Sequence, residues 1–226
     1  MFDSISTFRS AEAINSAMAS VYKHMSLAVL TSMIVSLFVG TNPALLAFFF
    51  TGFVKWIVIF APLVAIFALS MNLDSMSKST AQLALHGFAA LMGLSFATIF
   101  AIYTMGSIFS AFMSAAVLFG VMSFYGYFTK KSLDSLGQFL FVGLIAIIIA
   151  SLINIFIGST VMQMVISAIA VIIFLGLTAY DTQKIREMVS IETETGNAEI
   201  IGALTLYLDF INLFLNLLQL FGGRKD

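Results

Sequence analysis

The sequence predicts an all-α polytopic membrane protein with seven transmembrane helices in a chain of 226 residues. Hydrophobic residues make up 61% of the chain and charged residues only 9%, whereas a typical soluble domain carries about 25% charged residues. So few charges could not cover a water-exposed surface of this size, which makes the lipid bilayer the expected surroundings. The net charge of −1 provides no basic excess, and this argues against a nucleic-acid partner.

Charged residues divide the chain into long uncharged segments, at residues 24–54, 56–73, 79–129 and 135–180. A single helix over 79–129 would be more than twice as long as the roughly 30 Å hydrocarbon core, at about 1.5 Å per residue. That segment therefore folds back. Only helices and closed β-barrels satisfy their backbone groups within lipid, and barrel strands are alternating segments of about 10 residues. These segments are longer and uniformly apolar, so helices are predicted.

The turns within the two longest segments are expected at residues 104–107 and 158–160, where glycine, serine and threonine gather. The predicted helices span residues 23–40, 51–71, 83–104, 108–128, 136–157, 161–181 and 200–221. Residues 1–20 form a polar cytoplasmic lead before the first helix, and 21–226 form a single transmembrane domain.

Lysine and arginine set the expected orientation, because cytoplasmic loops of membrane proteins are enriched in both. With the N-terminus in the cytoplasm, seven of these cations lie inside: Arg9, Lys23, Lys78, Lys130, Lys131, Lys184 and Arg186. Three lie outside: Lys55, Arg224 and Lys225. Because two of those three are at the C-terminus, residues 200–221 have two alternatives, a full crossing and a re-entrant helix. The length of the segment favours the crossing.

The last predicted helix carries a polar stripe, unlike the others. Its members are spaced 4, 3, 4 and 3 residues apart, which places them within an arc of about 80° on a helix. They are Thr205, Asp209, Asn212, Asn216 and Gln219. Polar side chains are costly in lipid, so the stripe is expected to face protein or a water-filled path. For the threonine and the two asparagines, hydrogen bonds between helices are an equally good interpretation.

Asp209 is the only acidic residue deep within a predicted span. An ionised carboxylate at mid-helix costs about 2.5–3.5 kcal/mol on insertion scales, so we expect protonation, contact with water or a metal ion, or a loop cation as partner. Asp181 closes the preceding span and is the second candidate. Alone, it could be an interfacial helix end paired with Lys184. If the two aspartates meet, they bind protons as a unit and offer hard oxygen ligands suited to Ca²⁺.

An enzyme is not predicted, and no cofactor is expected. The chain has no cysteine, which removes disulfides, thiolate catalysis and thiolate-bound zinc. Neither an HExxH motif nor a Ser–His–Asp arrangement is present. Intramembrane aspartyl proteases also use two aspartates, but they need a GxGD sequence, and residues 206–209 read LYLD.

Four segments of the chain now point to a known family. They are residues 93–95 (GLS), 123–131 (SFYGYFTKK), 174–184 (FLGLTAYDTQK) and 202–214 (GALTLYLDFINLF). The chain resembles the Bax inhibitor-1 family, specifically its bacterial inner-membrane branch. The resemblance extends over essentially the whole chain and is most specific in the last segment. It implies a seven-helix fold in which the last helix is central and wrapped by the other six.

The resemblance also implies a function. It assigns a pH-sensing pair to Asp181 and Asp209, and it associates the family with a pH-sensitive Ca²⁺ leak. In the calcium-leak members an arginine at the cytoplasmic end of the second span latches onto the pair. Residues 70–78 contain no arginine here. Lys78 is the possible latch cation, although a lysine lacks the bidentate geometry of arginine.

We therefore expect a pH-sensitive cation leak. Protonation of the aspartate pair would loosen the last helix and open a path for Ca²⁺ along the polar stripe. The alternative is a non-conducting regulator that binds a membrane-bound AAA protease, as some bacterial members do. Its expected contact region is the lead at residues 1–20.

Overall fold

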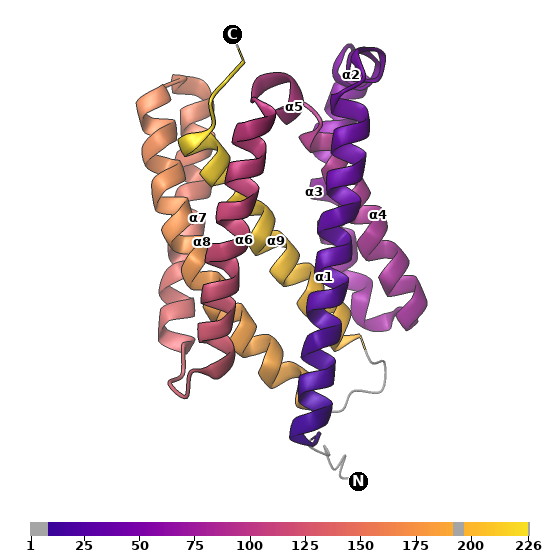
Figure 1. Cartoon of the computed structure of the whole chain (residues 1–226), viewed down its shortest axis with the longest axis vertical. Coiled ribbons are helices and arrows are strands. Elements are labelled where there is room, and N and C mark those ends of the chain that lie inside the picture. Colours follow the sequence, from indigo (N-terminus) through magenta and orange to yellow (C-terminus); the bar gives the residue numbers. More distant parts are fainter. Residues whose placement is uncertain (1–8, 192–196, 226) are drawn as a thin grey trace. The chain divides into compact units, whose positions relative to one another are not determined.

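The computed structural model describes residues 9–191 and 197–225. In this part of the chain the structure is helical, and seven helices are long and apolar enough to cross a membrane, which confirms the predicted fold class. Figure 1 shows the helices in chain order. They are α1 (Ala11–Gly40), α2 (Pro43–Phe50), α3 (Val54–Asn72), η1 (Leu73–Ser75), α4 (Lys78–Phe96), α5 (Ile99–Ile102), α6 (Met105–Phe128), α7 (Asp134–Ile157), α8 (Thr160–Val189) and α9 (Ala198–Phe221).

Two helix ends differ from the prediction. The expected lead at residues 1–20 is wrong for its second half, because α1 begins at Ala11, where Ser10 Oγ caps it by accepting a hydrogen bond from Ala13 N at 3.2 Å. The lead before that contains residues 1–8, which lie outside the described part. The sixth span does not end at residue 181 either, since α8 continues to Val189. Buried Ile185 and Val189 give this extension an apolar face, so it packs on protein beyond the purely apolar segment.

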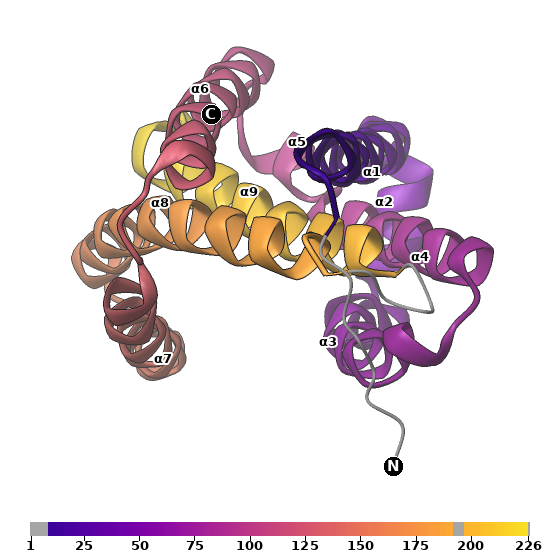
Figure 2. The ribbon, with the colours of Figure 1, turned by 90° about the horizontal axis from the view of Figure 1, so that it is seen from below.

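The chain falls into two compact units. The first contains the chain up to Ile102 together with Ile185–Tyr207, and the second contains Tyr103–Lys184 together with the chain from Leu208. Helices α8 and α9 each contribute residues to both units. In the views of Figures 1 and 2 both are continuous ribbons.

In the first unit, small residues allow α1 and α4 to approach closely. A Cβ on Gly93 would lie 2.5 Å from Ser32 O, so this glycine packs directly on the α1 backbone. Ser32 Oγ also lies 2.7 Å from both Ala89 O and the hydroxyl of buried Tyr207. At the start of α9, Asn197 Nδ2 donates to Leu73 O at 2.8 Å. These contacts fix the first half of α9 within its unit.

In the second unit, α6 and α8 meet at Gly126, where any Cβ would collide with the backbone of Ala179. The ring of Phe210 on α9 packs edge-on against Phe112 and Phe119 of α6. Beyond α9, Gly223 N donates to Ser107 Oγ at 2.9 Å, at the first turn of α6. The end of α9 therefore lies beside the start of α6, and the full crossing by α9 stays a prediction.

Candidate functional site

Helix α9 is the most buried of the seven candidate spans. Of the apolar 18-residue stretch within α9, 67% is buried, whereas the corresponding share in the other spans is at most 39%. Asp209 lies near the middle of this helix with only 4% of its surface exposed. The predicted central position of α9 among six helices stays a prediction, but the burial of Asp209 is that of an acid enclosed by protein.

Asp181 and Asp209 face each other in the second unit, and their carboxyl groups are close enough to share a hydrogen bond. A carboxylate has no proton to donate, so this bond requires a proton on one of the two groups. The Oδ2 atom of Asp209 is fully buried and accepts no hydrogen bond from an N–H or hydroxyl group of the described residues. The site thus offers a buried place for one shared proton.

Asp181 is not a helix end, because α8 continues past it to Val189. Lys184, its alternative partner, has its ammonium 2.6 Å from Asp134 Oδ1 at the start of α7. The side-chain partner of Asp181 is instead Asp209. This arrangement favours the paired-aspartate interpretation over a simple interfacial ion pair.

Three other members of the polar stripe, Thr205, Asn212 and Asn216, bond to their own helix. Thr205 Oγ1 donates to Ile201 O at 3.1 Å. Asn212 Nδ2 donates to Leu208 O, and Asn216 Nδ2 to Asn212 O, both at 2.8 Å. Within the described residues no hydrogen bond joins the stripe side chains other than Asp209 to a neighbouring helix, so the interhelical interpretation lacks support there. The two asparagine Oδ1 atoms remain as acceptors on the same side of α9 as Asp209.

Lys78, the possible latch cation, lies in the first unit. Its ammonium is 3.1 Å from Glu199 Oε2, in the first turn of α9. Ser20 Oγ of α1 donates to the same oxygen at 2.5 Å. The latch role stays a prediction, and the carboxylate that holds Lys78 is Glu199. Sequence reasoning missed this contact, although an acidic residue immediately before the start of a predicted helix was its signal.

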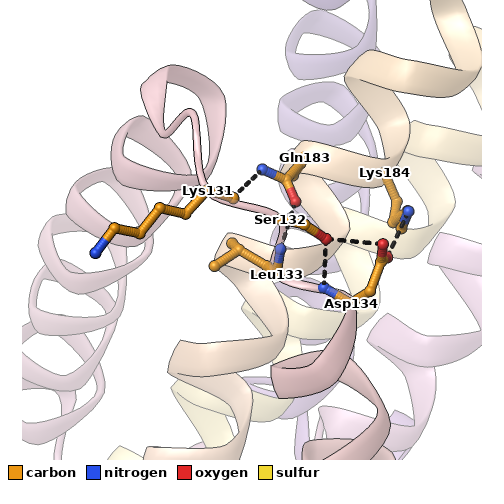
Figure 3. A network of polar contacts seen from close by, with 6 residues as sticks. All are labelled: Lys131, Ser132, Leu133, Asp134, Gln183 and Lys184. Carbon is orange, nitrogen blue, oxygen red and sulfur yellow. Dashed lines mark hydrogen bonds and ion pairs between the residues drawn. The ribbon is translucent and has the colours of Figure 1, made fainter.

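A second set of contacts missed from the sequence surrounds Gln183, immediately after the aspartate. Its side chain is buried, with 8% exposed, and it reaches the connection between α6 and α7 (Figure 3). Gln183 Nε2 donates to Lys131 O at 2.9 Å, and Leu133 N donates to Gln183 Oε1 at 2.8 Å. A neutral glutamine within a helix gives no sequence signal for such a role.

The two histidines are engaged by neighbouring polar groups in the first unit. His24 Nε2 lies 3.3 Å from Gln82 Nε2, and His86 Nδ1 lies 3.1 Å from Thr31 Oγ1. In the described part of the chain no three His, Asp, Glu or Cys side chains are grouped to hold a metal ion.

Comparisons with known proteins agree over nearly the whole chain. The family described as "Inhibitor of apoptosis-promoting Bax1" matches residues 14–226. The inner membrane protein YbhL of Escherichia coli K12 is 42% identical over 214 residues, covering 92% of each chain. Protein RP147 of Rickettsia prowazekii is 40% identical over 222 residues, covering 95% of this chain and 92% of its own. A protein of Borreliella burgdorferi is 38% identical over 217 residues, covering 94% of each.

Proposed function

The chain belongs to the Bax inhibitor-1 family, and from this premise we propose that it is a pH-sensitive Ca²⁺ leak whose proton sensor is the pair Asp181 and Asp209. The observation that carries the proposal is the close approach of the two carboxyl groups, within reach of a shared hydrogen bond, with Asp209 buried within α9. The name of the YbhL relative supports a location in the bacterial inner membrane, with the N-terminus in the cytoplasm.

The pair can respond to pH because its strength depends on its proton count. With one proton, the bond joins a carboxyl to a carboxylate, and such charge-assisted bonds are roughly twice as strong as neutral ones. A second proton makes both groups neutral and weakens the bond between α8 and α9. We therefore expect acidification to loosen α9, and the leak to rise as the pH falls.

The path we propose follows the polar stripe. From Asp209 Oδ2 the side-chain oxygens of Asn212, Asn216 and Gln219 succeed one another along α9. All are hard oxygen ligands, which suit Ca²⁺ better than they suit a soft metal. The three side chains are partly exposed rather than closed off, as conduction requires. This mechanism involves no bond-making chemistry and no cofactor.

The test is Ca²⁺ entry into liposomes that contain the purified protein and a Ca²⁺ indicator, between about pH 5 and pH 9, where a coupled buried carboxyl pair can titrate. We expect the parent protein to show a pH-dependent flux and Asp181→Asn and Asp209→Asn to lose that dependence. Asp74→Asn is the matched control, because Asp74 is exposed in η1. Identical pH profiles in all four proteins would remove the sensor role.

The second candidate function is a non-conducting regulator that docks on a membrane-bound AAA protease. The observation in its favour is that the latch position holds a lysine rather than arginine, and that Glu199 binds this lysine. Its contact region is the N-terminal lead. A deletion should stop before Ser10, because Ser10 caps α1 and Ser20 binds Glu199.

Deleting residues 1–9 separates the two candidates. If the regulator is correct, the shortened protein no longer retains the protease in a pull-down from membranes, while any Ca²⁺ flux is unchanged. If the leak is correct, the flux of the intact protein depends on pH whether or not the protease is present. Retention of the protease by the shortened protein would remove the lead as the contact region.

A further inference from the structure

Four consecutive residues of α8 hold four different parts of the second unit. Successive side chains on a helix point about 100° apart, so four in a row cover all directions around its axis. The contacts run from Asp181 to Asp209 on α9, from Thr182 to Ser123 on α6, from Gln183 to Lys131 and Leu133 in the connection, and from Lys184 to Asp134 on α7. The rotation of α8 about its axis is thereby fixed at the level of the aspartate pair.

Gln183 is opposite Asp181 in this arrangement. Two residues along a helix correspond to about 200°, so one side chain faces α9 while the other faces the connection between α6 and α7. The amide of Gln183 matches a peptide group, donating to one backbone carbonyl and accepting from one backbone N–H. Figure 3 shows the backbone of Lys131 held in this way while its side chain extends away from the glutamine.

The other two contacts of the segment restrain α8 less. The ion pair of Lys184 and Asp134 is solvent-accessible, with 36% and 53% of the side chains exposed, and exposed pairs contribute little. The Thr182 hydroxyl donates to Thr178 O of its own helix at 2.7 Å, and its oxygen lies 3.0 Å from Ser123 Oγ, a single contact with α6. Only the Gln183 contact is both buried and made to two groups of another element.

We propose that Gln183 is a positioning residue, which holds α8 in the rotation that keeps Asp181 against Asp209. The proposal rests on the proposed function in that the aspartate pair is taken to be the proton sensor. Loss of the glutamine contacts lets α8 turn and weakens the bond between the two carboxyl groups. This bond stabilises the pair when it holds one shared proton, so the singly protonated pair is the form that is destabilised most.

The ionisable groups around the segment are few. Asp209 faces Asp181 from α9, and Asp134 reaches Lys184 from α7. The connection contributes Lys130 and Lys131, whose side chains are exposed. Replacing the neutral Gln183 by a neutral residue changes none of these charges. An altered proton affinity of the pair would then come from geometry.

The test replaces Gln183 by methionine, which is unbranched and of similar length but has no amide. In infrared difference spectra of the protein in lipid, the carboxylic C=O band reports how many protons the pair holds as the pH changes. In the parent protein we expect two steps. In Gln183→Met we expect the two steps to lie closer together by about 0.5–1 pH unit, because the two carboxyl groups are then less strongly coupled. This shift corresponds to the free energy of about one hydrogen bond. The matched control is Gln138→Met. Gln138 is exposed on α7, and its side-chain amide makes no hydrogen bond within the described part of the chain.

The outcomes separate this proposal from the leak itself. Unchanged steps in Gln183→Met, with two clear steps in the parent, would overturn the positioning role while leaving the sensor intact. If the two protonation steps lie closer together in Gln183→Met but the parent protein conducts no Ca²⁺, the positioning role is supported and the leak is rejected. If Gln183→Met does not fold, Gln183→Leu, which is also neutral and has no amide, takes its place in the same infrared measurement. Steps as far apart as those of the parent would then overturn the proposal.

Discussion

The two acids of α9 are held in opposite ways. Glu199, in the first turn, has a cation beside it, Lys78 at 3.1 Å, and a serine hydroxyl that donates to it. Asp209, ten residues further along, has a second acid beside it and an oxygen that accepts no hydrogen bond from an N–H or hydroxyl group of the described residues. A carboxylate beside a cation favours its charged form near neutral pH. A carboxylate with another carboxylate needs a proton, and this is why only the second is a candidate sensor.

The sharpest way to break this comparison is to give Asp209 the kind of partner that Glu199 has. In Asp181→Lys, an ammonium faces the Asp209 carboxylate, and the pair no longer needs a shared proton. Asp181 is only partly buried, so this position is a better place for a longer, charged side chain than the buried position of Asp209. We expect the pH dependence of the Ca²⁺ flux to disappear entirely, with little flux at any pH.

Asp181→Asn serves as the companion variant, because it removes the acid without adding a charge. It should also lose the pH dependence, but without the attraction that closes the path in Asp181→Lys. The measurement is again Ca²⁺ entry into liposomes across the pH range. A flux in Asp181→Lys that still rises with acidification would show that the proton acts elsewhere.

The fold was predictable from composition, but the helix ends were not. Uncharged segments of membrane length locate six of the seven helices, because lipid requires long apolar runs, and the seventh lies in an apolar run whose only charged residue is Asp209. Beyond residue 181 the chain becomes polar, and there α8 continues on the pattern of a soluble amphipathic helix, with Ile185 and Val189 buried. The absence of charge marks only the part of a helix within lipid. The start of α1 at Ala11 was missed for the same reason.

For the site, the sequence identified the aspartates but not what surrounds them. A carboxylate in an apolar span is conspicuous because its cost is large. The contacts of Gln183, by contrast, join it to residues about fifty positions earlier in the chain, and neither a glutamine nor a backbone carbonyl stands out in a sequence. Polar contacts between distant segments become visible only when the structure brings the segments together.

The next largest effect concerns the polar stripe. Asn212 and Asn216 donate to backbone carbonyls of their own helix, so neither holds α9 to a neighbour. We expect Asn212→Leu to change the free energy of unfolding in detergent by no more than about 0.5 kcal/mol. The Ca²⁺ flux should fall about tenfold, because a hydrogen-bonding group that contacts a charge contributes about 1.5–3 kcal/mol.

Gln138→Leu is the matched control for this variant, since it removes an exposed amide from α7, away from the stripe. Its flux should equal that of the parent at every pH. A stability loss in Asn212→Leu without any change in flux would instead make the stripe a packing feature, as the interhelical interpretation holds.

The smallest effect tests the first member of the comparison. Lys78→Gln removes the cation from Glu199 but leaves the hydrogen bond from Ser20 in place. Because the Lys78 side chain is 47% exposed, the ion pair is screened by solvent, and we expect a loss of only about 0.5–1 kcal/mol in the free energy of unfolding. The difference from the parent should shrink at high salt. The pH profile of the Ca²⁺ flux should remain that of the parent, because Glu199 does not share its proton with another acid. If Lys78 is instead the latch that the family resemblance suggests, Lys78→Gln changes that profile as strongly as Asp209→Asn does, and the separation of the two acids into a structural one and a sensing one fails.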